Sequence, residues 1–502
     1  MRPLSEPRVK RPLNELERED PLRTFAELGR ALGRALKPSG RPVVCVQGLG
    51  FVGAAMAAAV AHAHDSEGRP HFDVVGVDLP TREGRAKVDA LNNGRAPMAT
   101  NDEDLARAIA DAHRRGNLLA TIDVRAFALA SVTVVNVPLD VVFEEDVPTV
   151  SYDHLREAIR TLGLHMPAGA LVIVETTVPP GTCERVAAPE LAQALAERGL
   201  PADAVMLAHS PERVMPGDSY LDSVVNFWRT YAGHTEEAGE ACHDFLSKVV
   251  NVEDYPLTRL QSTLASETSK VLENSYRATT IAFMEEWGRF AEAVGIDLFE
   301  VIGAIRRRPT HSNMRQPGFG VGGYCITKDP LLAQISAREL FGRGDLAFPF
   351  STQAVAVNSA MPLVSLRRAE ALLDGVLQDK TILLMGVSYR EDVGDTRHSP
   401  AETFVRQAHA AGATVLCHDP LVAEWPELDL PVLKELPPPD GVDLVVFAVP
   451  HRDYAALDFS AWLNGSRPAV LDANDVLSPA QRQFIRERGC KIGAIGRGFR
   501  EE

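Results

Sequence analysis

Residues 43–60, VVCVQGLGFVGAAMAAAV, contain a short apolar run, a glycine-rich turn and an alanine-rich stretch in direct succession. The apolar run fits a buried strand, and the alanine-rich stretch fits a helix that begins just after the glycines. Within the turn, Gly48, Gly50 and Gly53 have the spacing GxGxxG. This order of strand, tight turn and helix predicts the opening of a βαβ unit.

The same stretch indicates a dinucleotide site. The first glycine permits the turn, the second lets the backbone approach a pyrophosphate, and the third lets helix and strand pack closely. An isolated GxGxxG is weak evidence, but here the next apolar run, FDVVGVD, ends in Asp78, placed to bind an adenosine ribose. An acid there disfavours the 2′-phosphate of NADP, so we expect NAD. The open alternative is that Arg82 neutralises that phosphate; otherwise it is a solvated surface arginine.

Apolar runs and helix-like segments alternate along the chain, which predicts parallel sheets covered by helices. One series of runs precedes a helical stretch from Thr258 to Gly295, and a second series begins after Lys380. We therefore predict an α/β protein with two Rossmann-like doubly wound domains joined by a long central helix. The expected parts are an N-terminal extension (1–40), an NAD-binding domain (41–255), a central helical domain (256–375) and a C-terminal α/β domain (376–502).

Composition narrows the class of protein. The chain has 502 residues, 45% of them hydrophobic, and a formal net charge of -16, which argues against nucleic acid or an anionic membrane as partner. Its six cysteines form no CxxC pair and no histidine cluster has metal-ligand spacing, so we expect no metal and a reducing cytoplasm. Residues 1–20 have no apolar core segment, so we expect neither a signal peptide nor a spanning helix, and we expect a short helix within residues 21–36.

The stretch GGYCITKDP, residues 322–330, places Cys325 after two glycines and before Lys328 and Asp329. Oxidising an alcohol to an aldehyde needs no thiol. Taking the aldehyde on to an acid needs a nucleophile, because the carbonyl carbon has no hydride to give until it becomes tetrahedral. The setting of Cys325 therefore indicates a two-step oxidation, against the alternative of a buried cysteine that only packs.

On the central helix, Lys270 and Asn274 are four residues apart and share one face. A lysine and an amide together can stabilise negative charge on an alkoxide or thiohemiacetal oxygen. The alternative is a solvated helix surface, and only the presence of Cys325 favours a catalytic interpretation.

The ordered motifs resemble those of the nucleotide-sugar 6-dehydrogenases, the UDP-glucose/GDP-mannose dehydrogenase family, from about Pro42 to Gly498. Beyond those quoted above, the motifs are ETTVPPGT (175–182), SPERVMPG (210–217), SETSKVLENSYRATTIA (266–282), GFGVGGYCITKDP (318–330), GDTRHSP (394–400) and GAIGRG (493–498). Two of them, ETTVPPGT and SPERVMPG, are closer to the UDP-N-acetylhexosamine dehydrogenase branch.

The resemblance implies NAD-dependent, four-electron oxidation of a sugar C6 alcohol to a carboxylate, for polysaccharide or glycoconjugate synthesis, by a homodimer or higher homo-oligomer. It also implies that residues 256–375 form the dimerisation domain and that residues 376–502 bind the nucleotide sugar. It implies that Cys325 is the nucleophile, that Lys270 and Asn274 stabilise the oxyanion, and that Asp329 positions or activates water. Thr177 would hold a catalytic water and Glu212 would lie near the sugar. The implied cofactor residues are Gly48, Gly50, Phe51, Val52, Gly53, Asp78, Thr177, Lys328 and Arg397. The implied substrate residues are Glu212, Lys270, Asn274, Gly322 and Arg390.

Several positions depart from the family pattern. Pro216 replaces a glutamate of glucose-type members, and Arg390 replaces a lysine. The N-acetylhexosamine branch usually has GGHCI.VDP, in which Tyr324 replaces the histidine and Lys328 replaces the valine. The family's VPTP is VPLD here, so Leu139 removes an expected cofactor hydrogen bond. Two alternatives remain. One is a two-electron dehydrogenase of the 6-phosphogluconate or hydroxyacid type, and the other is a degenerate NAD-binding scaffold, which VPLD, Pro216 and an acidic Glu285 would favour.

Overall fold

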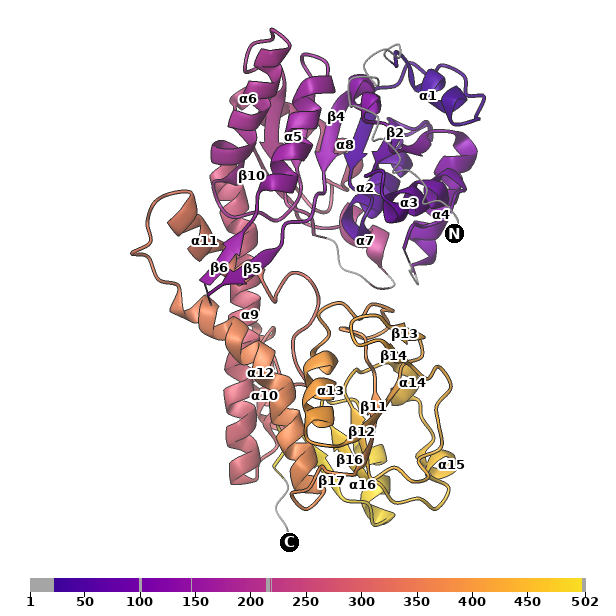
Figure 1. Cartoon of the computed structure of the whole chain (residues 1–502), viewed down its shortest axis with the longest axis vertical. Coiled ribbons are helices and arrows are strands. Elements are labelled where there is room, and N and C mark those ends of the chain that lie inside the picture. The colour runs from indigo at the N-terminus through magenta and orange to yellow at the C-terminus, as the bar shows by residue number, and fades with distance from the viewer. Residues whose placement is uncertain (1–21, 99–101, 146, 214–216, 218, 499–502) are drawn as a thin grey trace, which may run out of the picture.

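The computed structural model describes residues 22–98, 102–145, 147–213, 217 and 219–498, so Pro216 and residues 1–21 lie outside the described residues. Two α/β lobes lie at opposite ends of the molecule, and two long helices run along one side between them (Figure 1). These helices are α9 (Thr263–Val294) and α12 (Pro349–Leu372), and they pack against each other through small side chains such as Ala278 and Ala354.

The first lobe contains an eight-stranded sheet in the order β10-β9-β8-β7-β4-β1-β2-β3. All neighbouring strands are parallel except β8 and β9. The strands are β1 (Val43–Gln47), β2 (Asp73–Val77), β3 (Leu118–Thr121), β4 (Ala130–Val135), β7 (Leu171–Val174), β8 (Met206–His209), β9 (Thr230–Gly233) and β10 (Thr258–Arg259). The order 3-2-1-4 of its first strands creates a crevice at the carboxyl ends of β1 and β4, where ligands of doubly wound sheets bind.

Both faces of this sheet are covered, which explains why central strands such as β7 (LVIV) are apolar at successive positions rather than alternating. Val44 and Val46 of β1 enter one core, and Val43 and Cys45 enter the other. The covering helices of the lobe are α2 (Phe51–His62), α3 (Arg82–Asn92), α4 (Glu103–Arg115), α5 (Asp153–His165), α6 (Ala188–Glu197), α7 (Tyr220–Val225) and α8 (Glu236–Val249). A hairpin of β5 (Val141–Glu144) and β6 (Val147–Val150) projects from the lobe toward α11 (Leu332–Glu339) (Figure 1).

The helix predicted within residues 21–36 is present as α1 (Phe25–Ala31). Phe25 and Leu28 are buried in the second core of the sheet, and Arg34 donates to the carbonyl oxygen of Leu118 at 3.2 Å. The segment before β1 is therefore built onto the first lobe from about Leu22 onward.

The predicted central helix is confirmed as α9, but it begins later than the sequence predicts. Residues 258 and 259 form β10 beside β9, and the helix begins after Ser262, whose side chain accepts a hydrogen bond from the Ala265 amide. Gly295, in the left-handed conformation with φ 76°, ends it as predicted.

The second lobe contains a parallel five-stranded sheet in the order β12-β11-β15-β16-β17. This is the other common doubly wound order, so the predicted fold class is confirmed. The strands are β11 (Thr381–Met385), β12 (Thr414–His418), β15 (Leu444–Phe447), β16 (Ala469–Asp472) and β17 (Ile492–Ala494), beside a small pair, β13 (Glu424–Trp425) and β14 (Leu430–Pro431). The remaining helices are α10 (Leu298–Arg306), α13 (Pro400–Ala410), α14 (Arg452–Ala455), α15 (Phe459–Leu463) and α16 (Pro479–Glu487).

Candidate active site

The glycine turn between β1 and α2 is shaped by steric limits at two of its glycines. Gly48 has φ +88°, and a Cβ there would lie 2.6 Å from the carbonyl oxygen of Asn136. A Cβ at Gly53 would lie 1.8 Å from the carbonyl oxygen of Gly48. Both positions therefore require glycine, one for the turn and one for the close packing of helix on strand.

The turn fits a pyrophosphate. A Cβ at Gly50 would meet nothing within 4 Å, so space lies open above the backbone there. Gly50 is also the N-cap of α2 and supplies no side-chain cap, which leaves the first amides of a twelve-residue helix available to an anion. Phe51 and Val52, the first two residues of that helix, are both half-buried.

Asp78 follows β2 at the position expected for a ribose ligand. One carboxylate oxygen accepts from the Leu49 amide at 2.9 Å and the other from the Leu79 amide at 2.7 Å, which fixes the carboxylate beside the turn. Arg82, the group that would favour NADP, is exposed at the start of α3. The group that lies beside the glycine turn is therefore the carboxylate of Asp78.

Arg397 comes from the second lobe but reaches the first. Its guanidinium carbon lies 4.6 Å from the centre of the Phe51 ring, and Asp395 holds the side chain by paired hydrogen bonds of 3.0 and 2.7 Å. A cation thus lies at the N-terminus of α2. The contact of Arg397 with the cofactor, which the family resemblance implies, stays a prediction.

The predicted catalytic residues meet on one face of α9. Lys270 Nζ lies 3.2 Å from Oε1 of Glu212 and donates to the Glu212 carbonyl oxygen at 2.9 Å. One turn further on, Asn274 Nδ2 donates to Oδ2 of Asp329 at 2.7 Å. Lys328 Nζ donates to the other oxygen of Asp329 at 3.0 Å. Lys270, Asn274, Glu212 and Asp329 are all buried, so these are not solvated helix residues.

Cys325 is half-buried, whereas the other five cysteines are buried. Burial raises the pKa of its thiol to about 12, and the negative charges of Asp329 and Glu212 act in the same direction. The ammonium groups of Lys270 and Lys328 oppose this rise in pKa. The thiol therefore lies within the electrostatic field of both pairs described above, and it is protonated in the free protein at neutral pH.

Other predicted site residues have more varied surroundings. Thr177 is half-buried in the loop after β7. A Cβ at Gly322 would lie 2.8 Å from both the His398 carbonyl oxygen and the Tyr389 side chain, so this glycine permits packing against the second lobe. Its predicted contact with substrate stays a prediction. Leu139 is 3% exposed and belongs to the second core of the first lobe, which gives this departure from the family pattern a packing role.

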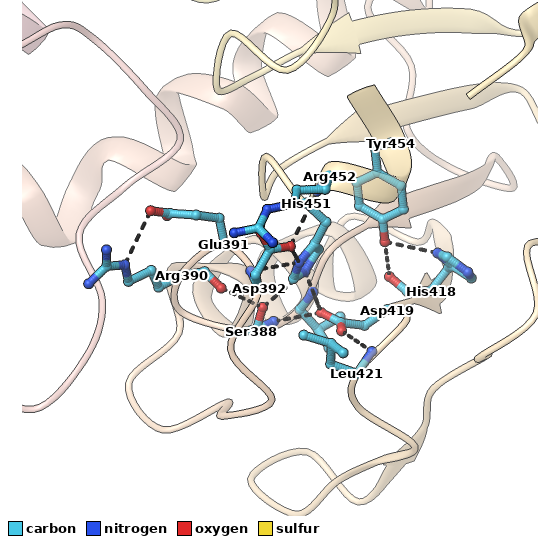
Figure 2. A network of polar contacts seen from close by, with 11 residues as sticks. Ser388, Arg390, Glu391, Asp392, His418, Asp419, Leu421, His451, Arg452 and Tyr454 are labelled. Atoms are coloured by element: carbon cyan, nitrogen blue, oxygen red, sulfur yellow. Dashed lines mark hydrogen bonds and ion pairs between the residues drawn. The ribbon is translucent and has the colours of Figure 1, made fainter. Parts of the chain in front are cut away.

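Arg390 lies on the loop after β11, at the crevice between β11 and β15 where the strand order of the second sheet reverses. Figure 2 shows its side chain directed away from the buried His451 and toward Glu391, with Nε 3.2 Å from Oε1. His451 anchors this loop, because its Nδ1 accepts from the Asp392 amide at 3.0 Å and its Nε2 lies 3.2 Å from both Ser388 Oγ and Asp419 Oδ2. His451 therefore holds the loop from within, and Arg390 pairs with Glu391 beside it. The predicted contact of Arg390 with substrate stays a prediction.

Sequence reasoning missed two features of the site. The first is Arg277, which lies less than one helical turn beyond Asn274. It is within electrostatic reach of Cys325 and Arg390, and partial burial lowers the pKa of its guanidinium. A buried chain from Asn136 through Glu175 to Arg229 supports the glycine turn, with Asn136 Nδ2 donating to Glu175 at 2.9 Å and an ion pair between Glu175 and Arg229. Arg277 and Glu175 lie within the motifs quoted above, but only the fold shows which way they face.

Family models match most of the chain. The NAD binding domain of the UDP-glucose/GDP-mannose dehydrogenase family matches residues 43–249, its central domain residues 264–360, and its UDP binding domain residues 383–479. With the glycine turn and Asp78, these matches define the class of protein as an NAD-dependent oxidoreductase. The chain belongs to the UDP-glucose/GDP-mannose dehydrogenase family, and the resemblance stated from the motifs is confirmed.

Individual relatives agree with this assignment. The chain is 28% identical over 461 residues to UDP-N-acetyl-D-mannosamine dehydrogenase of Methanocaldococcus jannaschii, covering 91% of this chain and 96% of that one. It is 28% identical to the NDP-N-acetyl-D-galactosaminuronic acid dehydrogenase of Ralstonia nicotianae, covering 83% and 92%. The crystal structure of NDP-N-acetyl-D-galactosaminuronic acid dehydrogenase from Methanosarcina mazei superposes with a TM-score of 0.74 at 25% identity, covering 91% of this chain and 96% of that one.

None of the helices in the described parts of the chain is long and apolar enough to cross a membrane.

Proposed function

We propose that this protein oxidises the C6 hydroxyl of a UDP-hexose or UDP-N-acetylhexosamine to the carboxylate, in two NAD-dependent steps through Cys325. The observation that carries the proposal is the convergence of the pairs Lys270–Glu212 and Asn274–Asp329 on the half-buried thiol. The names of the relatives favour an N-acetylhexosamine substrate. We propose that the uronate product enters polysaccharide or glycoconjugate synthesis, and that the protein acts in the cytoplasm, where its six free thiols would stay reduced.

The proposed reaction removes two hydrides from the sugar carbon and consumes one water. NAD, when bound, would supply the hydride acceptor, one molecule for each oxidation, with NADH leaving before the second molecule binds. The alcohol first loses a hydride and a proton and becomes an aldehyde. The thiol of Cys325 then loses its proton as sulfur adds to the aldehyde carbon, giving a thiohemiacetal whose C–H bond supplies the second hydride. Water cleaves the resulting thioester to the carboxylate and restores the thiol.

In this scheme the protein's own residues hold charge and position water. The ammonium of Lys270 and the amide of Asn274 face the oxygen that becomes negative when sulfur or water adds, and two such donors in a dry site stabilise it strongly. Asp329 orients the Asn274 amide through the 2.7 Å hydrogen bond and, in this proposal, directs the water. Positive charge at Arg277 and Arg390 suits a sugar diphosphate next to Cys325.

We also propose that the protein is a homodimer through α9. Six large apolar side chains, each more than 40% exposed, recur along one side of this helix: Leu272, Tyr276, Phe283, Trp287, Phe290 and Val294. Such a continuous apolar face on a long helix is the signature of an interface. In sedimentation experiments, Trp287→Glu should shift the native dimer toward monomer, whereas Trp228→Glu, at an exposed tryptophan outside this face, should not. A monomeric native chain would rule the dimer out.

The test of the reaction is to incubate the protein with NAD and a panel of UDP- and GDP-sugars that includes UDP-N-acetylmannosamine, UDP-N-acetylgalactosamine and UDP-glucose. Both NADH and the sugar product are followed. We expect two NADH per sugar and a uronate, and Cys325→Ser should stop after the first oxidation while Cys490→Ser retains full activity. One NADH per sugar with a carbonyl product would support the two-electron alternative. NAD binding without turnover of any sugar would support the degenerate scaffold.

A further inference from the structure

Asp140 and Tyr324 are 184 residues apart in sequence but joined in the structure. The hydroxyl of Tyr324 donates to Oδ1 of Asp140 at 2.5 Å. Asp140 ends the loop after β4, and Tyr324 directly precedes Cys325. The hydrogen bond therefore connects the NAD-binding lobe to the loop that carries the thiol.

The first partner lies on the rim of the NAD crevice. β4 is the neighbour of β1 at the point where the strand order reverses, so residues 136–140 leave the sheet where a dinucleotide is expected to lie. The start of this loop packs on the glycine turn, because Asn136 limits the space at both Gly48 and Gly53. Leu139 is buried in the core, which anchors the backbone next to Asp140.

The second partner contacts the catalytic cluster. Lys328 Nζ lies 4.4 Å from the centre of the Tyr324 ring, within the range of a cation–π interaction, and the same ammonium binds Asp329. Burial raises the pKa of the Tyr324 hydroxyl, and the hydrogen bond to Asp140 raises it further, so the group remains a donor at alkaline pH. Contacts thus run without interruption from Asp140 through Tyr324, Lys328 and Asp329 to Asn274 on α9.

We propose that Asp140 and Tyr324 are positioning residues that fasten the Cys325 loop to the rim of the NAD crevice and so hold the thiol next to the bound cofactor. The proposal rests on Cys325 being the nucleophile, as proposed above. It assigns a shared role to two positions that in the sequence are unrelated departures from the family pattern. Neither residue touches the reacting atoms; both act through the placement of Cys325.

The test measures alkylation of Cys325 by iodoacetamide with and without saturating NAD, a readout that needs no sugar. In the native protein we expect bound NAD to shield the thiol and slow alkylation at least fivefold. Tyr324→Phe and Asp140→Ala should reduce this NAD effect to less than twofold while NAD still binds. The double variant should equal either single variant, because both remove the same hydrogen bond.

Asp140→Asn keeps an oxygen that can accept from the tyrosine hydroxyl, so it should retain most of the shielding. Glu144→Ala on the neighbouring strand and Tyr255→Phe elsewhere in the first lobe are matched controls and should behave as the native protein.

Melting temperatures of all variants should stay within about 2 °C of the native value, since a partly exposed surface pair contributes little to stability. In sugar turnover, kcat should fall about tenfold with KM for the sugar nearly unchanged.

An absence of NAD shielding in the native protein, additive effects in the double variant, or equal damage from Asp140→Asn and Asp140→Ala would each overturn the proposal. Failure of the proposed reaction gives a different pattern. In that case no sugar is oxidised, yet the NAD-dependent shielding of Cys325 and its loss in Tyr324→Phe persist.

Discussion

The thiol of Cys325 should react slowly in the free protein, and the structure sets how slowly. Its pKa is raised from 9.0 to about 12 by burial and by the charges of Asp329 and Glu212. At pH 8 this rise of about three units lowers the thiolate population roughly a thousandfold, equivalent to ~4 kcal/mol. A thiolate of higher pKa is intrinsically more nucleophilic, and a Brønsted slope of about 0.45 returns a factor of roughly 20. The expected net retardation is about 50-fold.

The assay follows carboxamidomethylation of the peptide that contains Cys325 by mass spectrometry, between pH 7 and pH 10. The reference rate is that of the same cysteine in the urea-unfolded chain. The native rate should rise about tenfold per pH unit across the whole range without levelling off, because the folded pKa lies above it. The reference rate should begin to level off near pH 9.

Variants that alter the neighbouring charges test the cause of the raised pKa. Asp329→Asn and Glu212→Gln each remove a negative charge that raises the pKa of the thiol, so both should speed alkylation at pH 8. Lys270→Met removes an opposing charge and should slow it. A native rate that levels off with a midpoint below pH 9 would refute the reasoning, because it would show that the site stabilises the thiolate without any cofactor.

Two further predictions concern the NAD-binding lobe. Gly53→Ala places a Cβ 1.8 Å from the Gly48 carbonyl oxygen, so it should lower the melting temperature and weaken NAD binding, measured by calorimetry, at least tenfold. Gly50→Ala meets no protein atom, so it should weaken NAD binding and leave the melting temperature unchanged. Unaltered NAD affinity in both variants would contradict the assigned site. Glu175→Gln leaves the 3% exposed Arg229 without its charged partner and should lower the free energy of unfolding in urea by about 3 kcal/mol, whereas a loss below 1 kcal/mol would show that Arg229 finds other compensation.

The parts of the fold that could be predicted are those with a strong local signal. The apolar run, glycine turn and alanine stretch of residues 43–60 specify strand, turn and helix by themselves, and Gly295 marks the end of α9. The start of α9 was placed too early, at Thr258 instead of after the N-cap Ser262. The strands β3 and β10 were not predicted, since four residues (LLAT) and two residues (TR) carry no periodicity. The hairpin of β5 and β6 was also missed, because exposed valines and a phenylalanine do not distinguish a projecting hairpin from a core strand.

The residues of the candidate active site also differ in how far the local sequence predicts their contacts. Lys270 and Asn274 could be paired from the sequence because helical spacing alone puts them on one face. Their acidic partners could be named as candidates, but the contacts of Glu212 and Asp329 depend on segments 58 and 55 residues away. The joining of Asp140 to Tyr324 has no local signal at all, since it depends on how the two loops meet.

The two lobes begin with the same turn. The amide of Gly48 (φ +88°) donates to the Val77 carbonyl oxygen at 2.8 Å, and the amide of Gly386 (φ +98°) donates to the His418 carbonyl oxygen at 2.8 Å. After each second strand an aspartate closes the turn: Asp78 accepts from the Leu49 amide at 2.9 Å and Asp419 from the Val387 amide at 3.0 Å. A shared backbone design therefore underlies both predicted nucleotide sites.

The segments after these two turns differ, and this difference separates the two ligands. In the first lobe α2 starts at once and its N-terminus has no side-chain cap, so backbone amides are left for a pyrophosphate. In the second lobe thirteen residues separate Gly386 from α13, and Ser399 caps that helix with its own side chain. The amides at the start of α13 are thus already partly satisfied, and we predict that phosphate binding uses side chains on the loop that His451 anchors. The loop carries two arginines, Arg390 and Arg397. Because Arg397 lies against Phe51 of the first lobe, we predict that replacing Arg390 weakens binding of the nucleotide sugar while leaving NAD affinity unchanged.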